Sequence, residues 1–188
     1  MGLDETEIKR RVEMAADFVG ISKEILKSSP FELSGGQKRR AAIAGVIAME
    51  PKILVLDEPA AGLDPRGRSE ILGRLTKYRQ GSDKSIVIIS HSMEDVAEYS
   101  DRILAMNDGG ILCSGTPSEV FSHYDELCRS GLALPQITNI MNLVMKKCKE
   151  RGIPFDNSAA SFFTVDDAYK YLAQRLELKS EEGGNTVC

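Results

Sequence analysis

The chain of 188 residues has no tryptophan, only two histidines and few aromatic residues, 6% in all. No apolar stretch approaches the ~18 residues of a membrane-spanning helix, and the N-terminal residues do not follow the pattern of a signal peptide. Any work at a membrane is therefore expected to be that of a peripheral protein. With 42% hydrophobic residues, the chain still has enough apolar side chains for a buried core.

Cysteine and histidine show no metal-site spacing. The four cysteines, at positions 113, 128, 148 and 188, form no C-x-x-C pair, and neither His91 nor His123 is placed to complete a site with them. We expect all four to be reduced thiols. A histidine-based metal site is disfavoured.

A strong excess of one charge is also missing. The 24 Lys and Arg residues against 28 Asp and Glu give a net charge of −4. Nucleic-acid binding usually comes with a basic patch, so we expect no nucleic-acid partner. The short basic run Lys38-Arg39-Arg40 is predicted to be a solvated helix face.

Two short apolar runs, Ile53–Leu56 and Ile86–Ile89, lack polar alternation. This predicts strands of a parallel sheet that are buried on both faces. Between them, Arg68–Tyr78 is expected to form a crossover helix that Asp64 and Pro65 start. The segment as a whole is therefore predicted to be a βαβ unit.

Outside this unit, one hairpin and several helices are expected. Asn107-Asp108-Gly109-Gly110 predicts the turn of that hairpin. Residues 126–178 show a helical pattern that predicts a small C-terminal helical domain, and residues 179–188 are predicted to be a disordered tail. Further helices are expected at residues 4–20, 34–48 and 94–99 and from 116 onward.

Ser34-Gly35-Gly36-Gln37 opens one of these predicted helices. A helix N-terminus offers unpaired N–H groups and a positive dipole end to a phosphate, and glycines let the backbone approach closely. The same four residues also fit a plain capping box, in which Ser34 and Gln37 satisfy one another's backbone. The four residues alone leave both interpretations open.

Asp57 and Glu58 end the first strand, at the edge where open parallel sheets bind ligands. One acid there can hold Mg²⁺, commonly through water, and a second can polarise an attacking water. The alternative is an ordinary acidic turn. His91 follows the second strand, so it lies near both acids if the strands are neighbours, although a lone histidine is more often structural.

Gly62-Leu63-Asp64-Pro65 is, on its own, a turn and a helix start. A glycine-rich phosphate loop of the form G-x-x-x-x-G-K-[ST] is absent from the sequence. Gly110 to Thr116 has the glycine spacing of such a loop but not its lysine, and we expect a hairpin strand there.

In their order and spacing, Leu33-Ser34-Gly35-Gly36-Gln37, Ile53 to Pro59, Gly62 to Pro65 and Ser90-His91 resemble the nucleotide-binding subunit of ATP-binding-cassette (ABC) transporters. The resemblance covers about residues 3–178. It implies an α/β fold, a partial P-loop NTPase of the RecA-like ABC type, with a parallel sheet flanked by helices and a small C-terminal helical domain. ATP and Mg²⁺ are the implied ligands.

The resemblance also implies roles for individual residues. In this family the signature loop contacts the terminal phosphate of an ATP that the opposite subunit holds, and the D-loop crosses the dimer interface. The implied site residues are the signature loop Ser34, Gly35, Gly36 and Gln37, the D-loop Gly62, Leu63 and Asp64, the Mg²⁺ residue Asp57 (through water), the catalytic base Glu58 and the switch histidine His91.

Residues 29–45, 61–65 and 109–121 look like the ATPases of energy-coupling-factor importers, which take up vitamins or cobalt and nickel ions. The implied partners are a second ABC ATPase subunit, identical or different, a membrane coupling protein and a substrate-binding membrane subunit, at the cytoplasmic face of the membrane. The implied domains are the remainder of the helical subdomain with the signature helix (1–50), the C-terminal half of the RecA-like core (51–125) and a helical dimerisation-type domain (126–178).

In the family, the phosphate loop, an adenine-stacking aromatic and the Q-loop come from upstream sequence. We therefore expect the chain alone not to hydrolyse ATP, and to fold poorly or associate through bare strand edges. Met1 is expected to be an internal start or the start of a truncated gene product. Two alternatives stay open: a shortened non-catalytic subunit that lends its signature face to a complete partner, and an ABC-class ATPase outside this importer branch.

Overall fold

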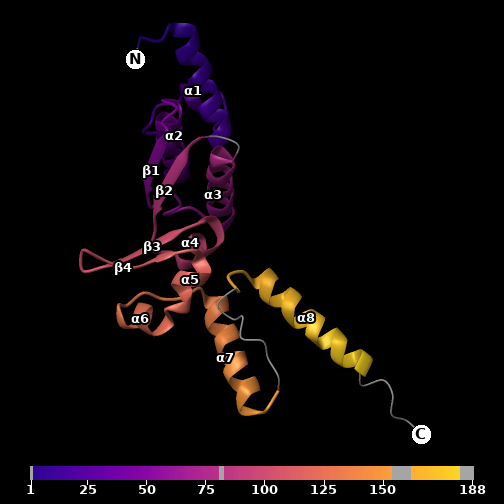
Figure 1. Cartoon of the computed structure of the whole chain (residues 1–188). Helices are drawn as coiled ribbons and strands as arrows, with labels where there is room; N and C mark the ends of the chain where they lie inside the picture. Colours follow the sequence, from indigo (N-terminus) through magenta and orange to yellow (C-terminus); the bar gives the residue numbers. More distant parts are fainter. Residues whose placement is uncertain (1, 81–82, 154–161, 183–188) are drawn as a thin grey trace. The chain divides into compact units, whose positions relative to one another are not determined.

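The computed structural model describes residues 2–80, 83–153 and 162–182. The chain divides into two compact units, Met1–His91 and Ser92–Cys188, and each is described by itself. Both units combine helices with a two-stranded sheet (Figure 1). Within the described residues, no helix is both long and apolar enough to cross a membrane.

The first unit is an α/β arrangement that agrees with the predicted fold class. Its sheet is a parallel pair whose strands are joined through a helix, which is the expected βαβ unit. Its elements in chain order are α1 (Glu5–Val19), η1 (Ile25–Lys27), α2 (Gly35–Ile47), β1 (Ile53–Asp57), α3 (Pro65–Arg79) and β2 (Ser85–Ile89).

Side-chain caps begin all three long helices of this unit. The side chains of Asp4, Ser34 and Asp64 accept hydrogen bonds from the backbone N–H three residues later, at the starts of α1, α2 and α3. Such caps satisfy N–H groups that have no partner inside a helix. Gly20 ends α1 with a φ of 76°, a left-handed conformation that glycine adopts at little cost.

The parallel pairing of β1 with β2 aligns the ends of the two strands. The register runs from Ile53 opposite Ser85 to Asp57 opposite Ile89. The residues that follow each strand therefore emerge at the same edge of the sheet.

The prediction that both faces of these strands are buried is wrong. Leu54 and Leu56 are buried, at 1% and 8% exposure, but Ile53 and Val55 are 65% and 59% exposed. Side chains alternate between the two faces of a sheet, and in the described residues only one face is covered. The open apolar side is completed on β2 by two further side chains, Val87 and Ile89.

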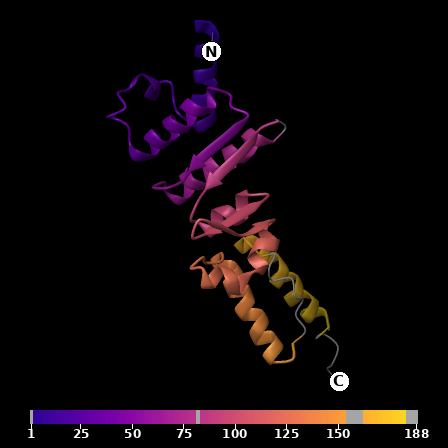
Figure 2. The ribbon, with the colours of Figure 1, turned by 60° about the vertical axis from the view of Figure 1, so that its left-hand side comes forward.

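The second unit contains the predicted hairpin. Asp108 and Gly109 join its strands with φ values of 48° and 77°, as a two-residue turn between antiparallel strands requires. The α5 helix contacts both strands (Figure 2). The elements of this unit are α4 (Met93–Tyr99), β3 (Ile103–Asn107), β4 (Gly110–Gly115), α5 (Pro117–Ser122), α6 (Tyr124–Arg129), α7 (Gln136–Glu150) and α8 (Val165–Glu182).

Two apolar clusters form the core of the second unit. One gathers buried side chains from α4 to the segment after α6, among them Ala105, Phe121 and Leu134. The other joins α7 and α8 through Met141 and Ala168. The α8 helix runs four residues past the predicted end at 178, and residues 183–188 of the predicted tail lie outside the described residues.

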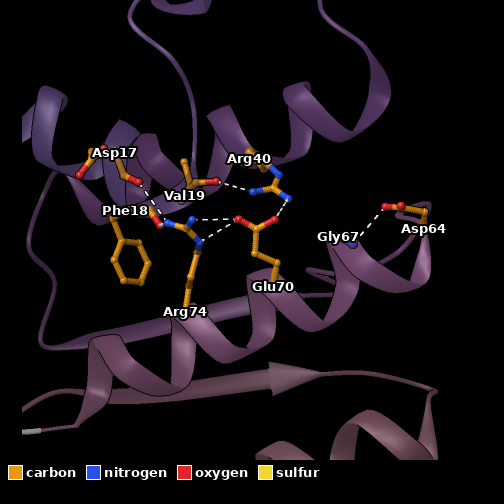
Figure 3. Close-up of polar contacts among 8 residues, drawn as sticks. All are labelled: Asp17, Phe18, Val19, Arg40, Asp64, Gly67, Glu70 and Arg74. Atoms are coloured by element: carbon orange, nitrogen blue, oxygen red, sulfur yellow. Dashed lines mark hydrogen bonds and ion pairs between the residues drawn. The ribbon is translucent and has the colours of Figure 1, made fainter.

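A polar network joins α1, α2 and α3 (Figure 3). Glu70 of α3 lies at its centre and accepts from Arg40 of α2 at 2.9 Å and from Arg74 at 2.8 Å. The last turn of α1 has no basic residue of its own, and carbonyls at a helix C-terminus need outside donors. Arg74 donates to the backbone carbonyls of Asp17 and Phe18, and Arg40 donates to that of Val19.

The charge of Glu70 should make the free energy of unfolding depend on pH in the acid range. Hydrogen bonds from Arg40, and next from Arg74, lower the pKa of Glu70 from 4.5 to about 2. A lowered folded-state pKa contributes stability above the unfolded pKa, and that stability is lost as the pH falls through the folded value. The melting-temperature difference between wild type and Glu70→Gln should therefore be full above pH 5 and shrink towards pH 2.

Melting curves by circular dichroism from pH 7 to pH 2 measure this difference. Glu13→Gln, at an exposed position of α1, is the control and should track wild type. A gap between wild type and Glu70→Gln that stays constant down to pH 2 would contradict the assigned role of the Glu70 charge.

Candidate functional site

The predicted catalytic pair meets at the carboxyl edge of the parallel sheet. Glu58 directly follows β1, and His91 lies two residues after β2. The Glu58 Oε1 atom accepts from the His91 backbone N–H at 2.9 Å and lies 2.6 Å from Nδ1 of the same residue. The strand register brings together two side chains that are 33 positions apart in sequence.

Exposure differs within this pair. The His91 side chain is 84% exposed, whereas that of Glu58 is 31% exposed. Glu58 therefore lies partly within the sheet edge, while the imidazole projects from it. An imidazole so placed can contact a ligand at the edge and still bind the carboxylate. A carboxylate held in this way by an imidazole is placed as a general base would need to be.

Glu58 has an unusual backbone conformation. Its φ of 48° lies in the left-handed region, which few residues other than glycine adopt. Its N–H donates to the carbonyl of Ile89 at 2.9 Å, which extends the strand pairing by one residue. Strained backbone of this kind persists where surrounding contacts hold it, and it gathers at functional sites.

Asp57, the predicted Mg²⁺ residue, is the last residue of β1 and is exposed. Among the residues that the structure describes, no three His, Cys, Asp or Glu side chains gather to hold a metal ion. One exposed carboxylate suits Mg²⁺ that keeps most of its water or binds phosphate oxygens as well. Asp57 thus fits the ion as a single ligand.

The signature residues form a complete capping box at the start of α2. The Gln37 N–H donates to Ser34 Oγ at 3.2 Å, and the Ser34 N–H donates to Gln37 Oε1 at 2.8 Å. The capping interpretation of these residues is therefore confirmed. It leaves the dipole of α2 and the exposed Gly35 backbone open to an anion, so the phosphate interpretation stays a prediction.

The signature residues and the D-loop touch one another. A Cβ on Gly36 would lie 3.2 Å from Leu63 Cδ2, which explains a glycine at this position. Gly62 has a φ of 73°, and Asp64 caps α3 by accepting from the Gly67 N–H at 3.1 Å. A Cβ on Gly67 would lie 2.6 Å from that carboxylate oxygen, so a larger residue there would require the Asp64 side chain to shift.

Sequence reasoning missed two arginines near the site. The prediction that Lys38-Arg39-Arg40 is a solvated face is wrong for the last two, which are partly buried. Arg39 donates to backbone carbonyls next to Glu58, and Arg40 binds Glu70. A run of three charges directly before an apolar helix segment carries a weak signal of this, because consecutive residues point to different sides of a helix.

The structure also tests the rejection of a phosphate loop at Gly110 to Thr116. Gly110–Gly115 is a strand paired with β3, so its rejection as a phosphate loop is confirmed. Ser92 caps α4 by accepting from the Asp95 N–H at 3.3 Å. Ala60 is 5% exposed, and its methyl group is buried.

Comparison with known proteins bears on these motifs directly. Residues 2–61 match the ABC transporter family. The energy-coupling factor transporter ATP-binding protein EcfA2 of Caldanaerobacter subterraneus subsp. tengcongensis is 46% identical over 176 residues, 94% of this chain and 59% of that protein. The chain spans about 60% of the length of the curated relatives that it matches.

Solved structures give the same picture. The structure of cbiO1 from Clostridium perfringens, part of the ABC transporter complex cbiONQ, has a TM-score of 0.59 and 41% identity, over 76% of this chain and 56% of that one. The ATP-binding cassette MJ0796, in a dimer bound to ADP and Pi, has a TM-score of 0.57 and 25% identity, over 62% and 50%. These neighbours confirm the predicted fold class.

Two variants of Ser34 should separate its capping role from any role with phosphate. Ser34→Ala removes the cap and should lower the free energy of unfolding by about 1 kcal/mol. This corresponds to a melting temperature lower by about 2–4 °C for a chain of this size. Ser34→Asp keeps an acceptor and should melt close to wild type.

Thermal melting monitored by circular dichroism measures both variants. Ser69→Ala, an exposed serine inside α3, is the matched control and should change the melting temperature little. A Ser34→Asp variant that melts as low as Ser34→Ala would show that the cap is not what Ser34 contributes.

Proposed function

The chain carries an ABC transporter ATP-binding domain, and from this premise we propose that it is an ATP-binding subunit of an energy-coupling-factor importer. The observation that carries the proposal is the contact of Glu58 with His91 at the edge of the parallel sheet. In this proposal the importer takes up vitamins or cobalt and nickel ions, and ATP hydrolysis drives the uptake.

The proposed site is divided between two subunits. Ser34 and the glycines at the start of α2 contact the terminal phosphate of an ATP on the opposite subunit. The exposed helix N-terminus supports this, because its N–H groups and dipole favour an anion. The D-loop, Gly62 to Asp64, crosses the same interface, and the close approach of Gly36 to Leu63 makes the two loops one surface.

Within its own subunit, Glu58 takes a proton from the attacking water, and His91 orients the Glu58 carboxylate and contacts the terminal phosphate. The 2.6 Å contact between the two side chains supports this division of work. Mg²⁺ would bind at Asp57, commonly through water, and neutralise phosphate charge when present. The proton that the attacking water loses is accepted by the Glu58 carboxylate.

The proposed partners are those that the family resemblance implies. They are a second ABC ATPase subunit, a membrane coupling protein and a substrate-binding membrane subunit, and the chain lies peripherally at the cytoplasmic face of the membrane. In this assignment, residues 1–50 belong to the helical subdomain, 51–125 to the RecA-like core and 126–178 to a dimerisation domain. The apolar cluster that joins α7 and α8 lies wholly within residues 126–178 and supports helix packing inside this part.

A second candidate function applies if the residues given, which include no G-x-x-x-x-G-K-[ST] motif, act without a phosphate loop of their own. In that candidate the chain hydrolyses no ATP itself and lends its signature face to a partner that carries the phosphate loop. Both candidates give Ser34 the same role, and they differ only in whether Glu58 works in a site of its own.

Complementation tests the shared part of the proposal. The partner is a full-length ABC ATPase subunit that carries the phosphate loop but has an inactivating change in its own signature loop. Adding this chain should restore ATP hydrolysis, because the chain supplies the missing signature face. Ser34→Asp should fold but restore little, because its carboxylate repels the phosphate.

Phosphate release, followed over a titration of the chain into a fixed amount of partner, measures this restoration. Ser69→Ala should restore as well as wild type. Failure of the wild-type chain to raise the rate of the altered partner at any ratio would overturn the proposed function.

A further inference from the structure

Arg39 of α2 holds the turn that carries Glu58. Its guanidinium donates to three consecutive backbone carbonyls, those of Asp57, Glu58 and Pro59, the last at 3.2 Å. These carbonyls run from the last residue of β1 into the following turn. One side chain therefore contacts the whole stretch of backbone that presents Glu58.

This turn needs such a contact because of its conformation. Glu58 has a φ of 48°, which a residue with a Cβ rarely adopts without support. Its backbone is held on two sides: its N–H donates to Ile89 at 2.9 Å, and its carbonyl accepts from the Ala61 N–H at 3.1 Å. Arg39 adds a charged donor to the same carbonyl, and charged donors form the stronger hydrogen bonds.

The contacts of Arg40, the next residue of α2, fix the direction in which the Arg39 side chain points. Arg40 binds Glu70 of α3 and the Val19 carbonyl, at 2.9 and 2.7 Å, and Figure 3 shows it fixed between these two partners. Successive residues of a helix point about 100° apart. The contacts of Arg40 oppose rotation of α2 about its own axis. The Arg39 side chain therefore stays directed at the Glu58 turn.

We propose that Arg39 is a positioning residue for Glu58 and ties the signature helix rigidly to the catalytic turn of the same subunit. The N-terminus of α2 carries Ser34, and its second turn carries Arg39. If a phosphate bound at the N-terminus displaces α2, Arg39 moves with the helix. Its hydrogen bonds then shift the backbone of Glu58 as well. In a pair of subunits, this links the phosphate contact made at one ATP site to the base of the other.

The inference rests on the proposed roles of Ser34 and Glu58, but its test uses the chain as it is and needs no ATP hydrolysis. The two histidines of the chain give two separate imidazole C–H signals in proton NMR. His91 contacts Glu58, whereas His123 lies in the second unit and serves as an internal reference. Arg39→Gln should shift the His91 signal and leave the His123 signal in place.

Amide hydrogen exchange supplies the second readout. In Arg39→Gln, the protection of the Glu58 and Ala61 amides should fall about tenfold, while the amides inside α3 keep theirs. Arg39→Lys retains one charged donor and should recover part of both effects. Arg10→Gln removes an exposed arginine of α1 and should change neither readout.

Each outcome decides the proposal. A shift confined to His91, with local loss of protection and partial recovery in Arg39→Lys, supports it. Unchanged His91 and Glu58 signals in folded Arg39→Gln overturn it, and so does faster exchange spread evenly over the first unit, which marks a general structural role. Failed complementation by the wild-type chain would refute the proposed function and leave this result standing.

Discussion

The parallel pairing of β1 with β2 is the constraint on which the site depends. It sets Asp57 opposite Ile89, so that Glu58 and His91 leave the sheet at the same edge and meet at 2.6 Å. A slip by one residue would send the side chains of one strand to the other face and separate the pair. The crossover through α3 makes this register possible, and Asp64, which starts α3, also lies in the loop predicted to cross a subunit interface.

Local caps determine where helices begin, whereas long-range contacts join one element to another. Ser34, Asp64 and Ser92 each begin a helix with a side-chain hydrogen bond, so the starts of the helices are encoded within four residues of sequence. The arginines of α2 work over longer distances. Arg39 reaches the Glu58 turn, and Arg40 joins α1 to α3 through Glu70. Through these two side chains, the signature helix is joined to α1, to α3 and to the Glu58 turn.

Much of this fold was predictable from sequence because its signals are local. Capping residues, the Asp108-Gly109 turn and two short apolar runs marked the helices, the hairpin and the strands, and the structure confirms them. Of the candidate site, the contact between Glu58 and His91 was predictable because strand order follows from the βαβ pattern. The functional roles of these residues remain predictions.

What sequence could not supply was set by packing at a distance. The open side of the sheet, with Val55 at 59% exposure, depends on how many layers cover the strands, and a strand's own residues do not encode that number. Arg39 and Arg40 looked like solvated charges because their carbonyl partners lie 18 to 21 positions away in sequence and are brought near only by folding. No periodic pattern in the sequence indicates the long-range partners of a charged side chain.

The central proposal is that the chain supplies the signature face and the catalytic base, Glu58, of a shared ATP site, and that the sequence given does not hold nucleotide by itself. Thermal melting with and without Mg-ATP tests this most directly, because a ligand that binds the folded state raises its melting temperature. The account predicts no rise for the chain alone, and a rise only when a subunit with a phosphate loop is added. A cooperative transition of the chain alone that moves up markedly with Mg-ATP would contradict it.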